Sequence, residues 1–199
     1  MKTRALVSTT ILLCILFLLF AQKLYSQKMP SSIPKEVDIG VNGIFISDNY
    51  GVGKILGDSL NLLKATTHMP FPHINYVNKD STELLVLISH HGAYKYEFSE
   101  FRITKFNQPF REEYTVLSNV VKFTTYKGLS LGMNVSEFRK IFGFHFYMLP
   151  EGDTIEYVYQ LRDDENSPFL EFYNMPIYYG NYTFKNDQLI KIEFGFKYP

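Results

Sequence analysis

Two segments near the end of the chain alternate apolar and polar residues so regularly that they restrict the fold to one containing a sheet. The apolar positions are Ile155, Tyr157, Tyr159 and Leu161 in the first segment and Ile190, Ile192, Phe194 and Phe196 in the second. A period of two places one set of side chains on a single face of a β-strand, with that face buried. The 18 Phe and 15 Tyr residues also favour strands. We therefore expect an antiparallel sheet.

A short helix is predicted ahead of these strands, over residues 135–142. Asn134 is followed three residues later by Glu137, a variant of the capping box that begins helices. Gly143 stands where such a helix would end. The residues that recur at the spacing of one helical face are Val135, Phe138, Ile141 and Phe142.

Further strands are expected on both sides of this helix. The predicted strands are Val120–Tyr126, Phe169–Tyr173 and Tyr178–Phe184, and a turn at Lys185–Asp187 joins the last of them to the strand over 190–197. Their aromatic and β-branched residues are typical of strands.

The chain repeats part of itself at an offset of 86 to 88 residues. The segment 54–57 corresponds to 140–143, and Gly92, Tyr94, Tyr96 and Phe106 correspond to Gly180, Tyr182, Phe184 and Phe194. Matches at both ends of a unit indicate tandem modules, with chance similarity as the alternative because the identities are few. The predicted fold class is α+β, with two tandem modules that each pack a short helix on a small antiparallel sheet. We place them at 36–108 and 115–199, with a linker over 109–114.

Local signals in the first module are poorer. Asp48 takes the capping position, but Gly51 and Gly53 fall inside the candidate helix, where each costs about 1 kcal/mol relative to alanine. The connection from 59 to 80 is predicted to be a loop. Residues 81–89 and 92–103 are predicted to form a hairpin, and Leu84 to Ile88 should be its most buried strand.

The second module carries a family resemblance. Lys127–Gly143 (KGLSLGMNVSEFRKIFG) and Tyr182–Phe194 (YTFKNDQLIKIEF) resemble the helix-then-sheet module of the β-lactamase inhibitor protein family. The small lipoprotein of the outer-membrane β-barrel assembly machine is similar. The resemblance implies a fold more than a function, and members of such families mostly bind other proteins of the bacterial envelope. The chain lacks a lipobox and has a glycine-broken first helix, so the resemblance does not imply inhibition of a β-lactamase.

Residues 1–26 follow the order of a secretory signal peptide. Lys2 and Arg4 precede an unbroken apolar run from Ala5 to Ala21, and cleavage is expected after Ser26. The run is near the lower limit for spanning a bilayer, so an uncleaved anchor is the alternative. Both readings place the rest of the chain across the membrane. We predict an exported protein, periplasmic or extracellular, with an N-terminal linker over 27–35.

The composition after this segment excludes several classes of site. Cys14 is the only cysteine and lies inside the apolar run, so the mature chain has no disulfide, cysteine nucleophile or thiolate metal site. Without the three basic residues of the N-terminal segment, the net charge is near −3. No basic patch indicates a nucleic-acid partner.

No motif predicts a cofactor, a metal site or a catalytic centre. Residues 51–54, Gly-Val-Gly-Lys, lack the first glycine and the Ser or Thr of a phosphate loop. His68 and His73 lie five residues apart, which suits neither the helix nor the strand spacing of metal ligands. Together with Asp80 they form the one loop group worth testing for metal binding. His90 and His91 are adjacent and would point to opposite faces of a strand.

A cluster of acids provides the alternative, an envelope hydrolase. Its members are Asp153, Glu156, Asp163, Asp164 and Glu165. Paired carboxylates serve glycoside hydrolysis, but acids flanking a strand are also typical of solvated turns.

A tyrosine-rich hairpin is the candidate partner-binding surface. Tyr173, Tyr178 and Tyr179 crowd it, and tyrosine is enriched at recognition surfaces. Tyr179 alternates with polar residues, so its side chain is expected to be exposed. The sequence hypothesis is an exported, non-enzymatic protein-binding module of the bacterial cell envelope, partnered by another envelope protein. A membrane-tethered structural protein is the third reading.

Overall fold

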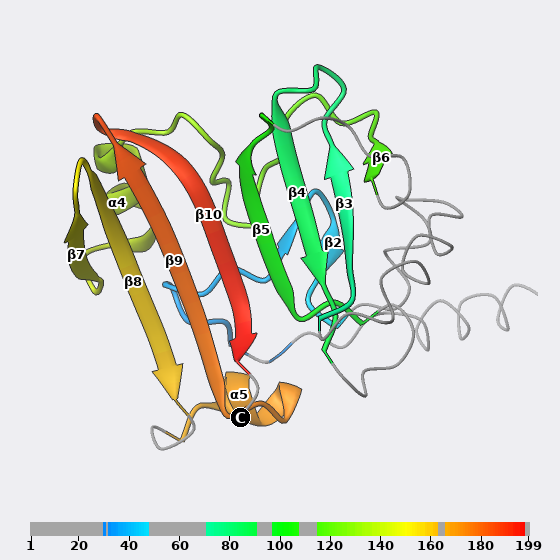
Figure 1. The fold of residues 1–199 in the computed structure, drawn as a ribbon. Helices are drawn as coiled ribbons and strands as arrows, with labels where there is room; N and C mark the ends of the chain where they lie inside the picture. The colour runs from blue at the N-terminus through cyan, green and yellow to red at the C-terminus, as the bar shows by residue number, and fades with distance from the viewer. Residues whose placement is uncertain are drawn as a thin grey trace, which may run out of the picture. The chain divides into compact units, whose positions relative to one another are not determined.

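Strands from both halves of the chain join in a single sheet in the computed structural model, which describes residues 30, 32–47, 71–90, 97–107, 115–162 and 166–197 (Figure 1). Within these residues the sheet has eight strands in the order β6-β3-β4-β5-β10-β9-β8-β7. Neighbouring strands are antiparallel except β3 and β6, which are parallel. A separate pair, β1-β2, lies outside it.

The elements have the following bounds. The strands are β1 (Gly40–Val41), β2 (Ile44–Phe45), β3 (His73–Val77), β4 (Glu83–Ile88), β5 (Glu100–Lys105), β6 (Thr115–Leu117), β7 (Tyr147–Glu151), β8 (Thr154–Arg162), β9 (Ile177–Lys185) and β10 (Gln188–Lys197). The helices are α4 (Val135–Phe142) and α5 (Pro168–Tyr173). The structure is thus an α+β fold dominated by antiparallel strands.

Helix α4 confirms the prediction made from its sequence. The side chain of Asn134 accepts a hydrogen bond from the Glu137 N–H at 2.9 Å, and the Glu137 carboxylate accepts one from the Asn134 N–H at 3.1 Å. Gly143 has a φ of 85° and its N–H donates to the carbonyl of Arg139. Because every one of these contacts spans four residues or fewer, the sequence alone specifies both ends of the helix.

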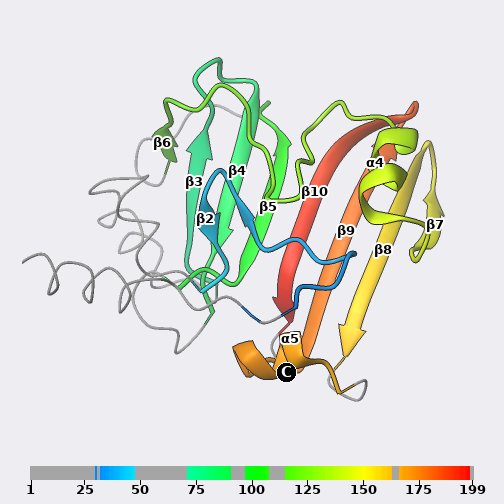
Figure 2. The ribbon, with the colours of Figure 1, turned by 180° about the vertical axis from the view of Figure 1, so that it is seen from behind.

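The core lies on one face of the sheet, beneath α4 and the β1-β2 pair, which Figure 2 shows in front of the strands. Phe138 of α4 is fully buried, and its ring centroid lies 5.0 to 5.5 Å from those of Tyr157, Tyr182 and Phe184. Tyr157 and Leu161 are buried as the alternation predicts, but Ile155, opposite Pro150 of the edge strand β7, is 43% exposed, so its predicted burial is wrong. Aromatic pairs at these separations add to the free energy gained by burial.

The last hairpin confirms the predicted turn but contains a bulge. Asn186 and Asp187 both have positive φ, of 50° and 62°, as a two-residue turn between twisted strands requires. The register then shifts between Leu189 and Lys191. As a result Leu189 is fully buried and Ile190 only partly, so the predicted core role of Ile190 is wrong. An extra residue in a strand reverses the face of the residues before it.

Two of the predicted strands are wrong. Phe169–Tyr173 lies in α5, because Pro168 in its first turn fits a helix start and Asn174 ends it in the left-handed conformation, with a φ of 52°. Over 120–126 only Thr125 makes a bridge, to Val41. The N–H of Phe123 donates to the Glu83 carboxylate at 2.7 Å, and the backbone bonds that this segment makes are single ones that form no ladder.

The first half contains the predicted hairpin and one strand that was predicted to be a loop. Strands β4 and β5 pair in antiparallel fashion, and the apolar stretch of β4 is largely buried. The second strand of this hairpin is β5, which begins at Glu100. Residues 91–96 lie outside the described part. The loop predicted over 59–80 includes β3 at His73–Val77. The helix expected after Asp48 lies outside the described residues.

Pairing of β5 with β10 connects the two halves. Five residue pairs join them, and at Phe101 and Phe194 the rings stack with centroids 5.2 Å apart. Residues from both predicted modules therefore share one sheet and one core.

Candidate functional site

The face of the sheet opposite the core is polar over its middle strands. Cross-strand partners in an antiparallel sheet share a face, so the registers place Arg102, Glu193 and Asn181 in one row across β5, β10 and β9. Glu100, Gly195 and Tyr179 form the next row. We call this surface the polar face; it consists of Glu100, Arg102, Thr104, Glu156, Gln160, Tyr179, Asn181, Thr183, Lys191 and Glu193. Figure 1 shows it toward the viewer, with no described helix or loop in front of β8, β9, β10 or β5.

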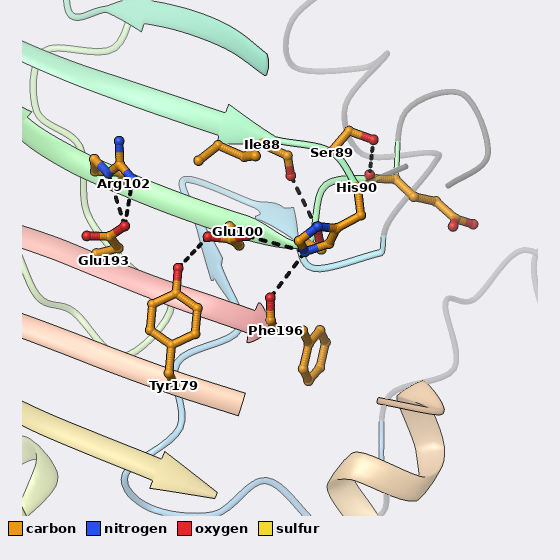
Figure 3. A network of polar contacts seen from close by, with 10 residues as sticks. Ile88, Ser89, His90, Glu100, Arg102, Tyr179, Glu193 and Phe196 are labelled. Carbon is orange, nitrogen blue, oxygen red and sulfur yellow. Dashed lines mark hydrogen bonds and ion pairs between the residues drawn. The ribbon is translucent and has the colours of Figure 1, made fainter. Parts of the chain in front are cut away.

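Tyr179 and Glu100 meet across an intervening strand because that strand has a glycine between them. The Tyr179 hydroxyl donates a hydrogen bond to Glu100 Oε2, although β9 and β5 are separated by β10 (Figure 3). Gly195 lies in register with both residues. It has a φ of 151°, and a Cβ built on it would lie 2.2 Å from the carbonyl oxygen of Ser99. Only glycine fits this position, because the Cβ would also lie 3.0 Å from Cγ of Glu100, the residue that binds Tyr179.

His90 extends the contact from its place after β4. Its Nε2 lies 3.3 Å from Glu100 Oε1 and 3.1 Å from the carbonyl oxygen of Phe196 (Figure 3). Both neighbours are acceptors, so Nε2 carries the proton and donates to them. Burial lowers the pKa of His90, although Glu100 and the Phe196 carbonyl favour the charged ring. The imidazole is therefore neutral at pH 7.

The Tyr179 hydroxyl is a hydrogen-bond donor and not a reactive phenolate. Burial, followed by the charge of Glu100 and the hydrogen bond to it, raises the pKa of Tyr179 well above its ordinary value. Lys197 lies over the ring, with Nζ 5.1 Å from the centroid. A tyrosine held protonated between a carboxylate and a cation is fixed in one position.

A second group of charges lies one row away. Arg102 donates to Glu193 Oε1 at 2.7 Å from Nη2 and at 3.2 Å from Nε, and Lys191 Nζ lies 2.5 Å from Glu193 Oε2. Burial alone would raise the pKa of Glu193, but the bonds from Arg102 and Lys191 outweigh it and hold the pKa below its usual value. The carboxylate is thus charged and paired on both oxygens. Such charge-assisted contacts pre-organise a surface.

A cleft of about 540 Å³ opens where β5 and β10 diverge. Their pairing ends at Thr104 and Lys191, and Leu189 bonds instead to Gly132 and Met133. Glu83 lies among the lining residues, and burial raises the pKa of its carboxyl despite the N–H bond from Phe123. The lining residues of the cleft come from the ends of β4, β5 and β10, from the segments beside them and from the loop before α4, and not from the polar face.

The three tyrosines of the predicted binding surface are not an exposed cluster. Tyr178 is fully buried in the core, where its hydroxyl binds both the N–H and the carbonyl of Asp38 at 2.9 Å. Tyr179 retains 5% of its exposure, so the expectation that it is exposed is wrong. The alternation placed it correctly on the non-core face, but its hydroxyl binds Glu100 and Lys197 lies over its ring. Tyr173 is half-buried in α5, with its ring 5.1 Å from that of Phe196.

The acids and histidines singled out from the sequence do not converge among the described residues. Asp153 is bound to Lys185 at an exposed turn, and residues 163–165 lie outside the described part. His73 Nδ1 lies 3.1 Å from the carbonyl oxygen of Phe71, and His68 also lies outside the described part. In the part of the chain that the structure describes, no group of three or more His, Cys, Asp or Glu side chains is placed to hold a metal ion.

The sequence analysis missed the residues that organise the polar face. His90 was noted without a partner, while Glu100, Arg102 and Glu193 were not identified. Gly195 was the one available signal, because a glycine inside a regular strand pattern marks a close approach of backbone or side chain.

Comparison of the chain with protein-family models, with curated proteins and with solved structures gives no match. Within the described residues, no helix has the length and apolar character needed to cross a membrane.

Proposed function

We propose that this chain is an exported, non-enzymatic protein of a bacterial cell envelope that binds another envelope protein through the polar face. The observation that carries the proposal is the pre-organisation of that face. Glu100, Glu193 and Tyr179 are held by partners within the sheet, over strands that no described element covers. A rigid polar surface loses little conformational entropy when a partner binds, which favours recognition.

The chemistry of the face suits a protein partner. Half-buried Thr104, Asn181 and Thr183 lie beside Lys191 and Glu193 in the rows of the second charged group, and they offer both donors and acceptors. A typical protein interface contains about ten direct hydrogen bonds, many at polar side chains of this kind. The Tyr179 hydroxyl and His90 Nε2 both bind the Glu100 carboxylate. This arrangement favours a structural role over proton transfer for the three residues.

Export and the family relationship belong to the same proposal. The order of charged, apolar and small residues in 1–26 supports export. The succession of α4 and four antiparallel strands supports a module like that of the β-lactamase inhibitor protein family. Two tandem modules, 36–108 and 115–199, are supported by the matching sets β3-β4-β5 and β8-β9-β10, which lie on either side of the β5-β10 pairing.

The test is affinity capture of the chain from the envelope fraction of its host, with chemical crosslinking and mass spectrometry. The face variant is Thr183→Arg, which places a long cation at the middle of β9, and its matched control is Ser136→Arg on the exposed side of α4. We expect one stoichiometric protein partner for the wild type and the control, and its loss in the face variant. Equal capture by both variants would refute the use of this face.

A further inference from the structure

One end of the sheet carries an unusual amount of exposed apolar surface. Strand β7 is the last strand in the sheet order, and within the described residues nothing pairs with its outer edge. Tyr147, Met148 and Leu149 keep 75%, 56% and 52% of their exposure. Phe144, just before the strand, is also exposed. An apolar edge strand is a template for pairing with another strand.

The backbone of β7 identifies which residue presents its polar groups outward. Pro150 lies opposite Ile155 of β8. Proline has no N–H, so this pair is a non-hydrogen-bonded one, and the neighbouring pairs on β7 alternate from it. Met148 is two residues away and therefore also turns its N–H and its carbonyl away from β8. Because Pro150 has no donor, Met148 is the residue of β7 with both a donor and an acceptor at the outer edge.

We propose that β7 pairs with β7 of a second copy of this chain, antiparallel and with the twofold axis at Met148. Met148 of each copy then exchanges two hydrogen bonds with its equivalent, which uses both outward groups. Tyr147 lies beside Leu149 of the second copy, and the reverse contact forms by symmetry. The exposed apolar side chains of one edge cover those of the other.

The charges at the two ends of β7 fit the same pairing. His145 precedes the strand; its side chain is 84% exposed and its Nδ1 lies 3.0 Å from Glu36 Oε1, while Glu151 ends the strand and is exposed. With the axis at Met148, His145 lies opposite Glu151 of the second copy, and this contact also occurs twice. The second ring nitrogen of His145, the one not bound to Glu36, can thus contact a carboxylate at each end of the interface.

The competing register is less favourable. With the axis at Leu149, each Met148 N–H would donate to a Pro150 carbonyl, so both registers form two backbone hydrogen bonds and the side chains decide between them. Tyr147 would then lie opposite Glu151. This pairing mixes an apolar ring with a carboxylate, so the axis at Met148 is the one that we infer.

Single cysteines test the pairing and its register in the full chain. Cys14→Ser removes the native thiol, and Met148→Cys, Tyr147→Cys and Leu149→Cys then supply one thiol each. In a hydrogen-bonded antiparallel pair the Cα atoms are about 5.5 Å apart, within the range of a disulfide. The two copies of residue 147 would lie more than about 7 Å apart, as would the two copies of residue 149, which is too far for that bond.

We expect a disulfide-linked dimer on a non-reducing gel at position 148 and little at 147 or 149. Preferential linkage at 149 would overturn the Met148 axis. Absence of linkage at all three positions, or linkage to a different protein, would overturn self-pairing.

A second pair of variants gives an independent measurement by light scattering of the purified chain. Met148→Pro removes the outward N–H while leaving the β8 ladder intact, as Pro150 already does. Met148→Ala keeps the N–H. We expect at least a tenfold weaker dimer for the proline variant than for the alanine variant, with unchanged circular dichroism in both. Equal dimerisation of the two would refute the backbone pairing. The edge tested here does not include the polar face, so this result does not depend on the proposed function.

Discussion

Replacing Asp38 by asparagine should remove a pH-dependent loss of stability from this protein. Asp38 is fully buried, with Oδ1 accepting from the Ile39 N–H at 2.9 Å and Oδ2 from the Lys127 N–H at 3.4 Å. Burial raises the pKa of its carboxyl from 3.8 to about 6, although a hydrogen bond from Thr125 and the backbone N–H groups oppose the shift. The folded chain therefore holds a proton that the unfolded chain releases.

The sign and size of the effect follow from these two pKa values. Below pH 3.8 both states are protonated and the group contributes no difference. Between pH 3.8 and about 6 the unfolded state loses its proton first, so the free energy of unfolding falls as the pH rises. With 1.36 kcal/mol for each pKa unit, the loss is about 3 kcal/mol and is complete above about pH 7.

The assay is urea unfolding at several pH values from 3.5 to 7.5, followed by circular dichroism, for the wild type and Asp38→Asn. Asparagine cannot ionise, so the variant should gain about 3 kcal/mol relative to the wild type across this range, whatever its stability at low pH. Subtracting the two curves cancels the other titrating groups that the chains share.

Asp153→Asn is the matched control because its sign is opposite. Asp153 is exposed, and its hydrogen bond with Lys185 lowers the pKa of its carboxyl. Its contribution to stability is present above the unfolded pKa and is lost as the pH falls. A flat difference curve for Asp38→Asn, or one that rises in the wild type's favour with pH, would refute the reasoning about Asp38.

Three other substitutions test the polar face and α4 by urea unfolding. Gly195→Ala should cost about 2 to 4 kcal/mol, because its Cβ would lie 2.2 Å from the Ser99 carbonyl oxygen at a φ of 151°, and a cost near zero would contradict that packing. Tyr179→Phe should cost about 1 to 3 kcal/mol by removing one of the two donors of the half-buried Glu100 carboxylate, and an unchanged midpoint would show that the bond contributes nothing. Asn134→Ala should cost about 1 kcal/mol, whereas Ser136→Ala, within the same helix, should change little, so equal losses would argue against the cap.

The sequence predicted the elements whose signals are local. Helix α4 and its two ends are specified by contacts between residues at most four apart. The alternation over 155–161 and the turn at 186–187 likewise depend on neighbouring residues. The strand predicted at 169–173 failed for a related reason: its aromatic content outweighed Pro168, which began a helix instead.

The candidate site was not predictable from the sequence in the same way. Tyr179 and Glu100 are 79 residues apart, and they meet only because β5 pairs with β10 and Gly195 lies between them. The predicted exposure of Tyr179 was wrong because alternation identifies the face of a side chain but not what lies beside it on that face.

By itself, the sequence determined the α+β character of this protein, the position and capping of α4, and the faces of most strands in its second half. Tertiary structure decided which strands are neighbours, where β3 forms, and which polar side chains pair. The physical reason is range. Caps, turns and alternation are set by hydrogen bonds and side-chain directions within a few residues, whereas pairing of β5 with β10 and the contact between Asp38 and Tyr178, 140 residues apart, arise only when the whole core packs.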